Sequence, residues 1–177
     1  QAARNGTLPK VLVPVHLCGT SCDMAAIAAL AQRYGVSVLE DASHAIGGSY
    51  HGAPVGNCRY SAITVFSFHP VKIITTAEGG LATTNDAQLS QRMIELRSHG
   101  ITKDESRFER TSPGPWSYEQ QSLGFNYRLT DLQAALGISQ LKRLDAIVTE
   151  RQRLLAVYRI KLASLPVSLL ECPPNVG

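Results

Sequence analysis

Two side chains capable of chemistry each follow a stretch that is typical of a buried strand. Lys72 closes the run FSFHPVK (66–72), and Asp41 follows the run VSVLE (36–40). A lysine amine is a nucleophile only when neutral, and a partly desolvated site at the edge of a sheet favours the neutral form. Taken alone, each residue is ordinary, because most loop lysines are solvated and an Asp after a strand often caps the next turn. A specific site requires the two to meet.

The sequence around Asp41 predicts elements that could bring Asp41 and Lys72 together. Val11–Leu17 is typical of a short buried strand, and an apolar stripe over Cys22–Tyr34 predicts a helix that ends at Gly35. Val36–Glu40 is apolar and β-branched, which favours a second strand. Strand, helix and strand in this order form a βαβ unit, so the two strands are expected to be parallel. Ligands of such sheets bind beyond the carboxyl ends of the strands, where Asp41 is expected to lie.

The remaining pattern predicts further strands and helices, with one long polar loop between them. A Gly-rich loop separates Val36–Glu40 from the next strand. The expected elements are a strand at Ala62–Phe68, a strand at Gly80–Thr84, a helix at Asp86–Ser98, a functional or disordered loop at 100–125, and a long helix from an N-cap at Thr130 to about Leu165 that bends or breaks near Asp145.

Joined in one site, Lys72 and Asp41 match the needs of pyridoxal phosphate (PLP). This cofactor requires a lysine that forms a Schiff base and an acid beside its pyridine nitrogen. The acid keeps that nitrogen protonated, so that the ring can accept electrons from the substrate. His44, three residues after Asp41, could join this site, although a capping Asp followed by a structural histidine would produce the same pattern.

Three motifs in sequence order carry a resemblance to a known family. EDASHAIGGSYHGAPVG (40–56), FSFHPVKIITTAEGGLATTND (66–86) and LGFNYRLTDLQAALGISQL (123–141) resemble the nucleotide-sugar aminotransferases of the DegT/DnrJ/EryC1/StrS family. The match extends over nearly the whole chain. It implies an α/β fold: an incomplete large domain of a fold-type I PLP enzyme, with a mixed, mostly parallel sheet and a long C-terminal connecting helix.

The resemblance also implies roles for four residues close to the cofactor. Lys72 would form the Schiff base and carry the proton between the substrate carbon and the cofactor. Asp41 would partner the pyridine nitrogen. His44 stands where many members carry Gln, and would bond the phenolic oxygen of the cofactor or pack on its ring. Ser67 resembles a ligand of the phosphate.

Three further residues are implied in cofactor or substrate contacts. Asn126 resembles the residue that reaches the cofactor phosphate of the other subunit in a homodimer. Arg128 is a candidate substrate or carboxylate contact, with a structural salt bridge as the alternative. His69 is a second candidate for a substrate contact, with a structural role in the turn before Pro70 as its alternative.

Within the family, a combination of three short motifs resembles the branch that makes pseudaminic acid. They are DASH (41–44), SFHPVKIITTAEGG (67–80) and RSHG (97–100). This resemblance implies a UDP-linked 4-keto-6-deoxy-N-acetyl sugar as substrate, glutamate as amino donor and a 4-amino sugar as product.

Members of the family are much longer than 177 residues. The resemblance therefore assigns residues 1–145 to the central part of the PLP-binding large domain. Residues 146–177 are expected to form the connecting helix and the start of a small domain. The upstream phosphate loop of the family has no counterpart here, so half of the cofactor contacts are expected to be missing and PLP binding by this stretch alone to be weak.

Composition excludes several other classes of function. The net charge is +3, from 17 basic and 14 acidic residues without a basic run, which is not typical of a nucleic-acid-binding protein. No apolar run reaches the roughly 20 residues that span a bilayer, and no signal-peptide core is present. Four irregularly spaced cysteines favour a reducing compartment. We therefore expect a cytoplasmic protein without membrane or nucleic-acid partners.

A metal site is conceivable near the N-terminus. His16, Cys18 and Cys22 are close enough in sequence to serve as metal ligands. A strand end followed by a helix start with half-buried thiols explains the same residues better, so no metal is expected.

Three alternatives to the aminotransferase remain. The related PLP-dependent sugar dehydratases carry histidine in place of the lysine, so Lys72 argues against them. A nucleotide-binding module is disfavoured because no phosphate-binding glycine motif follows a strand. A truncated, non-catalytic α/β domain that serves as a scaffold or binds a partner is the runner-up, because the upstream phosphate loop has no counterpart here.

Overall fold

The computed structural model describes residues 2–171, 173 and 176–177. The chain folds into two compact units. The first, the sheet unit, comprises Gln1–Thr84 and Asp131–Gly177. The second, the hairpin unit, comprises Asn85–Thr130.

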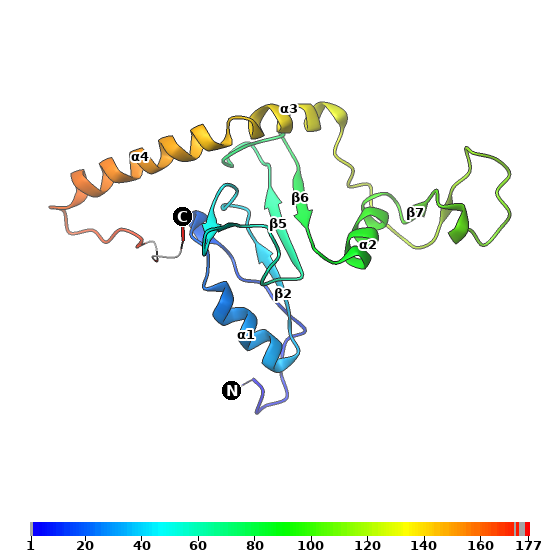
Figure 1. The fold of residues 1–177 in the computed structure, drawn as a ribbon, viewed down its shortest axis with the longest axis horizontal. Coiled ribbons are helices and arrows are strands. Elements are labelled where there is room, and N and C mark those ends of the chain that lie inside the picture. Colours follow the sequence, from blue (N-terminus) through cyan, green and yellow to red (C-terminus); the bar gives the residue numbers. More distant parts are fainter. Residues whose placement is uncertain (1, 172, 174–175) are drawn as a thin grey trace. The chain divides into compact units, whose positions relative to one another are not determined.

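In the described part of the sheet unit, four strands form the main sheet, in the order β1-β2-β5-β6. They are β1 (Val11–Leu12), β2 (Ser37–Asp41), β5 (Ile63–Ser67) and β6 (Gly80–Thr83). The first three are parallel to one another and β6 runs antiparallel to β5. Figure 1 shows β2, β5 and β6 side by side. The predicted α/β fold with a mixed, mostly parallel sheet is thus confirmed.

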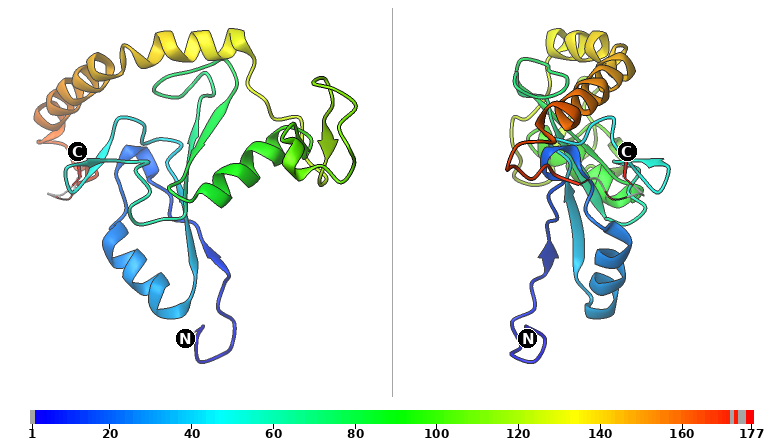
Figure 2. Two further views of the ribbon diagram at one scale, coloured as in Figure 1. Left: turned by 45° about the vertical axis from the view of Figure 1, so that its right-hand side comes forward. Right: turned by 90° about the vertical axis from the view of Figure 1, so that its left-hand side faces the viewer.

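Helix α1 (Met24–Tyr34) makes the crossover between β1 and β2, as the sequence predicts. It begins where the Asp23 side chain accepts a hydrogen bond from the Ala26 amide at 3.2 Å, which satisfies one of the free N–H groups of the first turn. It ends at Gly35, whose φ of 64° is the left-handed conformation that glycine adopts without strain. The helix lies beside β2 (Figure 2).

The core under α1 includes a side chain from the loop that the sequence marks only as Gly-rich. Met24 and Ala31 of α1 pack with Val38 of β2 and with Tyr50, all buried. The Tyr50 hydroxyl also donates a hydrogen bond to Asp23 at 2.7 Å, which ties this loop to the start of α1.

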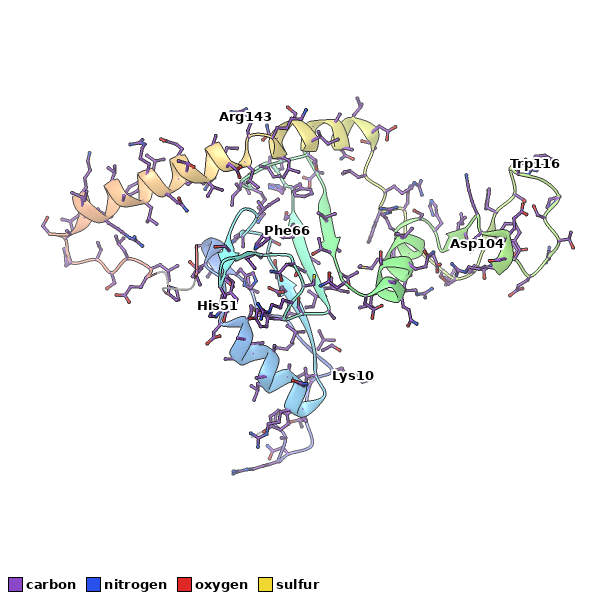
Figure 3. The ribbon with its side chains drawn as sticks, viewed as in Figure 1. Lys10, His51, Phe66, Asp104, Trp116 and Arg143 are labelled. Atoms are coloured by element: carbon purple, nitrogen blue, oxygen red, sulfur yellow. The ribbon has the colours of Figure 1, made fainter. Side chains whose placement is uncertain are left out.

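Tyr50 belongs to a short antiparallel hairpin, β3 (Ser49–Tyr50) with β4 (Ala53–Pro54). His51 and Gly52 form its turn with positive φ values of 50° and 74° (Figure 3). Such a turn matches the twist of two-residue hairpins. The sequence does not predict this hairpin, because a histidine rarely adopts a positive φ.

The predicted strand Val11–Leu17 is wrong in its length. Strand β1 ends at Leu12, and parallel pairing resumes only at Val15, which bridges to Asp41. Pro14 lies between them and lacks the N–H that a ladder needs. The chain then turns through the 3₁₀-helix η1 (Leu17–Gly19).

The long C-terminal helix is divided in two, close to where the sequence predicts a break. Helices α3 (Asp131–Leu141) and α4 (Leu144–Leu162) meet at Arg143 (Figure 3). The Arg143 amide bonds to the Gln140 carbonyl at 3.0 Å, a tighter i→i−3 turn that interrupts the α-helical ladder. None of the helices in the described residues is long and apolar enough to cross a membrane.

The hairpin unit contains α2 (Ala87–Arg97), capped by the Asp86 side chain. The predicted loop at 100–125 is more ordered than expected, since it holds the antiparallel pair β7 (Ile101–Thr102) and β8 (Glu119–Gln120) and the 3₁₀-helix η2 (Glu105–Arg107). A buried carboxylate organises it: Glu95 forms an ion pair with Arg107 and accepts a hydrogen bond from Gln91 at 2.8 Å.

A second buried carboxylate connects the strands of the main sheet. Glu40, on β2, bonds to His16 Nε2 at 2.9 Å, to Thr64 Oγ1 at 3.1 Å and to the Ser61 hydroxyl. Burial by itself raises the pKa of Glu40, but the hydrogen bonds from His16, Ser61 and Thr64 together lower it below the ordinary value. The carboxylate is therefore charged in the folded protein and satisfied on both oxygens.

We predict that Glu40→Gln lowers the free energy of unfolding by about 2 kcal/mol at neutral pH, because it removes the charge from three hydrogen bonds. Urea denaturation measures the loss. Ser37→Ala, at the exposed start of the same strand, is the matched control and should change stability by less than about 0.5 kcal/mol.

Wild type and Glu40→Gln, compared over a range of pH, also test the ionisation of Glu40. Because its folded-state pKa is lowered, its contribution is complete above the unfolded value of about 4.3 and is lost as the pH falls through the lower, folded value. The stability difference between wild type and Glu40→Gln should therefore shrink in acid. A difference that stays constant down to the acid transition would contradict this assignment.

Candidate active site

The parallel strands bring the predicted site residues to one edge of the sheet. Asp41 is the last residue of β2 and pairs with Val65 of β5, whose last residue is Ser67. The chain then turns, with the Lys72 amide bonded to the His69 carbonyl at 2.9 Å. Asp41, Ser67 and Lys72 therefore follow the carboxyl ends of two neighbouring strands, as the sequence predicts.

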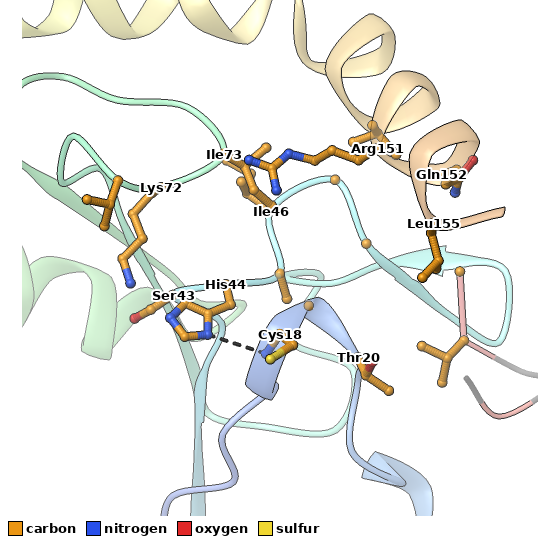
Figure 4. A pocket seen from close by; sticks show the side chains of 18 of the residues that line it. Cys18, Thr20, Ser43, His44, Ile46, Lys72, Ile73, Arg151, Gln152 and Leu155 are labelled. Carbon is orange, nitrogen blue, oxygen red and sulfur yellow. Dashed lines mark hydrogen bonds between the residues drawn. The ribbon is translucent and has the colours of Figure 1, made fainter. Parts of the chain in front are cut away.

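A cavity of about 660 Å³ opens at this edge. Figure 4 shows the Lys72 side chain within it, with its amine directed toward Ser43 and His44. The described lining residues from the strand-end loops are Cys18, Gly19, Thr20, Ser43, His44, Ala45, Ile46, Gly47, Gly48, Val71, Lys72 and Ile73. An amine, an imidazole and a hydroxyl thus share one half-enclosed space.

Asp41 is a stable anion at the base of this edge. The backbone amide of Ser43 donates a hydrogen bond to Asp41 Oδ1 at 3.0 Å. Hydrogen bonds from the hydroxyl and the amide of Ser43, and the nearby charges of His44 and Lys72, hold the pKa of Asp41 below its ordinary value. Such a carboxylate can hold a proton on a cationic ring nitrogen without becoming neutral itself.

His44 is oriented by the backbone of η1. Its Nδ1 accepts a hydrogen bond from the Cys18 amide at 3.4 Å (Figure 4). Cys18 has a φ of 57°, and this turn directs its N–H toward the ring. A neutral His44 therefore carries its proton on Nε2, which is free to donate a hydrogen bond.

Ser67 and His69 lie beside this edge, outside the described lining of the cavity. The Ser67 hydroxyl accepts a hydrogen bond from the His69 amide at 3.5 Å. The His69 ring accepts from the Val71 amide at 3.3 Å and lies 3.9 Å from the Glu78 carboxylate. These contacts shape the turn that carries Lys72, and the cofactor and substrate roles of the two residues stay predictions.

Asn126 and Arg128 belong to the hairpin unit and are exposed there. Asn126 forms a bridge with Ser98, and the rings of Phe125 and Tyr127 stack at 4.8 Å on either side of it in sequence. Because neither residue is part of the sheet unit that carries Lys72, the roles of Asn126 and Arg128 stay predictions.

Helix α4 forms a wall of the cavity that the sequence does not predict. Its contribution comes from one face of the helix, with side chains that recur at spacings of three and one residues and include Arg151. The helix packs closely on Gly47, where an added Cβ would lie 2.8 Å from Val148 Cγ2. The sequence predicts a helix here, but it does not predict that this face of the helix lies toward Lys72.

The alternative of a metal at His16 finds no support in the local contacts. Both ring nitrogens are engaged: Nε2 bonds to Glu40 and Nδ1 accepts from the Cys22 amide at 3.2 Å. The Cys22 thiol donates to the Val15 carbonyl at 3.3 Å, and burial raises its pKa. A thiol with a raised pKa is a poor metal ligand, because the thiolate is the form that binds.

Comparison with known proteins decides the family. The model of the DegT/DnrJ/EryC1/StrS aminotransferase family matches residues 2–176. The chain belongs to this family. The spore coat polysaccharide biosynthesis protein SpsC of Bacillus subtilis is 42% identical over 158 residues, which are 89% of this chain and 40% of SpsC.

Solved structures of the family share the fold. PseC of Helicobacter pylori, an aminotransferase of pseudoaminic acid biosynthesis, matches with a TM-score of 0.80 and 34% identity over 93% of this chain and 42% of PseC. The PLP form of the sugar aminotransferase Spr1654 of Streptococcus pneumoniae matches with a TM-score of 0.81 and 27% identity over 94% of this chain and 45% of Spr1654. The chain thus has the fold of fold-type I aminotransferases and spans less than half of each relative.

We predict that Ser43→Ala raises the pKa of Asp41 toward its ordinary value, because the hydroxyl hydrogen bond is the largest influence that lowers it. Carbon-13 NMR of the labelled carboxyl group against pH measures the change. Ser139→Ala, exposed on α3, is the control. An Asp41 titration that is the same in all three proteins would show that Ser43 does not set the charge of this carboxylate.

Proposed function

We propose that this chain is the lysine-bearing part of a PLP-dependent aminotransferase that aminates a nucleotide-linked 4-keto-6-deoxy sugar, with glutamate as the amino donor. One observation carries the proposal: a lysine amine and a stable carboxylate lie at the same sheet edge, beside a cavity of about 660 Å³. The family and its PLP-bound relative Spr1654 support it, and the likeness to PseC favours a sugar of the pseudaminic acid type.

The donor set at the edge fits PLP. The cofactor carries a cationic ring nitrogen, a phenolic oxygen, an aldehyde and a phosphate, and when bound it acts as an electron sink. Asp41 would hold the proton on the ring nitrogen, since its pKa is lowered. His44 Nε2 would donate a hydrogen bond to the phenolic oxygen, and the Ser67 hydroxyl would bind the phosphate.

Lys72 would form the covalent bond to PLP and transfer the proton during transamination. Its amine lies inside the cavity and is directed toward Ser43 and His44. The same amine would act as general base and acid, taking a proton from the substrate carbon and delivering it to carbon C4′ of the cofactor. The amine thereby serves as nucleophile and as general base at one position.

The other contacts complete the proposal. Asn126 would bind the cofactor phosphate of the other subunit of a homodimer, and His69 and Arg128 would contact substrate. We also propose that residues 1–145 form the central part of the large domain, and that 146–177 form the connecting helix and the start of a small domain. The protein would act in the cytoplasm, where its nucleotide-linked substrate is found.

The test adds PLP to the purified protein, reduces with borohydride and maps the added mass. We expect the mass on Lys72 in wild type and its loss in Lys72→Ala, because only this lysine faces the cavity among the described residues. Lys10→Ala, exposed and distant in sequence from the site, should label as wild type does.

The second arm of the test adds glutamate to the loaded protein. Conversion of glutamate to 2-oxoglutarate, with loss of the borohydride-reducible cofactor from Lys72, would support transamination. Labelling scattered over surface lysines, unchanged in Lys72→Ala, would overturn the proposal and favour a non-catalytic scaffold.

A further inference from the structure

Helix α4 presents one face to the cavity that holds Lys72. The lining residues from this helix recur at intervals of three and one, which places them on a single side. Figure 4 shows the Arg151 side chain extending from α4 toward Ile46 and Ile73. The side chains of this face are Val148, Arg151, Gln152, Leu155, Ala156 and Arg159.

The charges on the cavity wall have one sign. Lys72, Arg151 and Arg159 are its charged residues, and no Asp or Glu is present among the described residues that line it. Neither arginine has a carboxylate partner in the described part of the chain. A half-enclosed cavity whose wall carries two arginines without such a partner attracts an anionic ligand.

Arg153, on the same helix but outside the cavity lining, behaves differently. It forms two hydrogen bonds with Glu150, at 2.8 and 2.7 Å. Glu150 is thus used by the arginine that does not line the cavity, and the two arginines that do line it are left available to a ligand.

The spacing indicates an extended ligand. Arg151 and Arg159 lie eight residues apart on α4, which corresponds to about 12 Å along the helix axis. The guanidinium fork suits both carboxylate and phosphate oxygens. Extended arginine side chains can converge on one diphosphate, whose two phosphate groups offer oxygens to both forks, while the attached sugar extends toward Lys72.

We propose that Arg151 and Arg159 of α4 bind the diphosphate of the nucleotide-linked substrate and so orient its sugar toward Lys72. This inference rests on the proposed function for the identity of the ligand. The anion site itself depends only on the cavity and its charges.

The test measures the affinity of the protein for uridine diphosphate, for uridine and for glutamate by calorimetry. Arg151→Gln and Arg159→Gln should each weaken the binding of uridine diphosphate by about tenfold, the effect of losing one charge-assisted hydrogen bond. Uridine affinity should not change. Arg151→Lys should give an intermediate loss, because it keeps the charge and loses the fork. Arg153→Gln is the matched control and should bind as wild type does.

Several outcomes would overturn the inference. They are wild-type protein that does not bind uridine diphosphate, arginine variants that bind it as tightly as wild type, and a loss confined to glutamate binding, which would assign the arginines to the amino donor. Labelling of Lys72 by PLP separates the two proposals. If Lys72 labels but the arginine variants bind uridine diphosphate normally, only this inference fails. If diphosphate binding depends on Arg151 while Lys72 does not label, the anion site stands and the aminotransferase proposal fails.

Discussion

The parallel pairing of β2 with β5 is the constraint on which the candidate site depends. In the register observed, Asp41 lies opposite Val65, two residues before the end of β5. Parallel strands end at the same edge, so the acid after one and the lysine after the other must meet there. An antiparallel pairing would put them at opposite edges. The α1 crossover, with its cap at Asp23 and its end at Gly35, is what makes the parallel arrangement of β1 and β2 possible.

Two carboxylates that are neighbours in sequence have different tasks, because strand geometry gives their side chains opposite directions. Glu40 faces the interior and bonds to His16 and Thr64, which joins three segments of the sheet unit. Asp41 faces the ligand edge, and its pKa is lowered mainly by Ser43. Glu40 thus stabilises the end of the strand that carries Asp41, while Ser43 sets the charge of Asp41.

The sequence predicts much of this arrangement, and the failures have physical causes. The βαβ unit, the caps at Asp86 and Gly35 and the edge position of Lys72 follow from local rules of periodicity and capping. The sequence does not predict the β3–β4 hairpin, because its turn places a histidine at positive φ. Nor does it predict the cavity wall on α4, because the position of that wall depends on contact between segments about a hundred residues apart, at Gly47 and Val148. Local patterns do not carry such information.

The proposed function requires Asp41 to control the protonation of a cofactor attached to Lys72. The decisive measurement is nitrogen-15 NMR of PLP labelled at its ring nitrogen, bound to the wild-type protein and to Asp41→Asn. We expect a protonated ring nitrogen in wild type, because the carboxylate with the lowered pKa remains charged beside it, and an unprotonated one in Asp41→Asn. A ring nitrogen in the same protonation state in both proteins would contradict the claim.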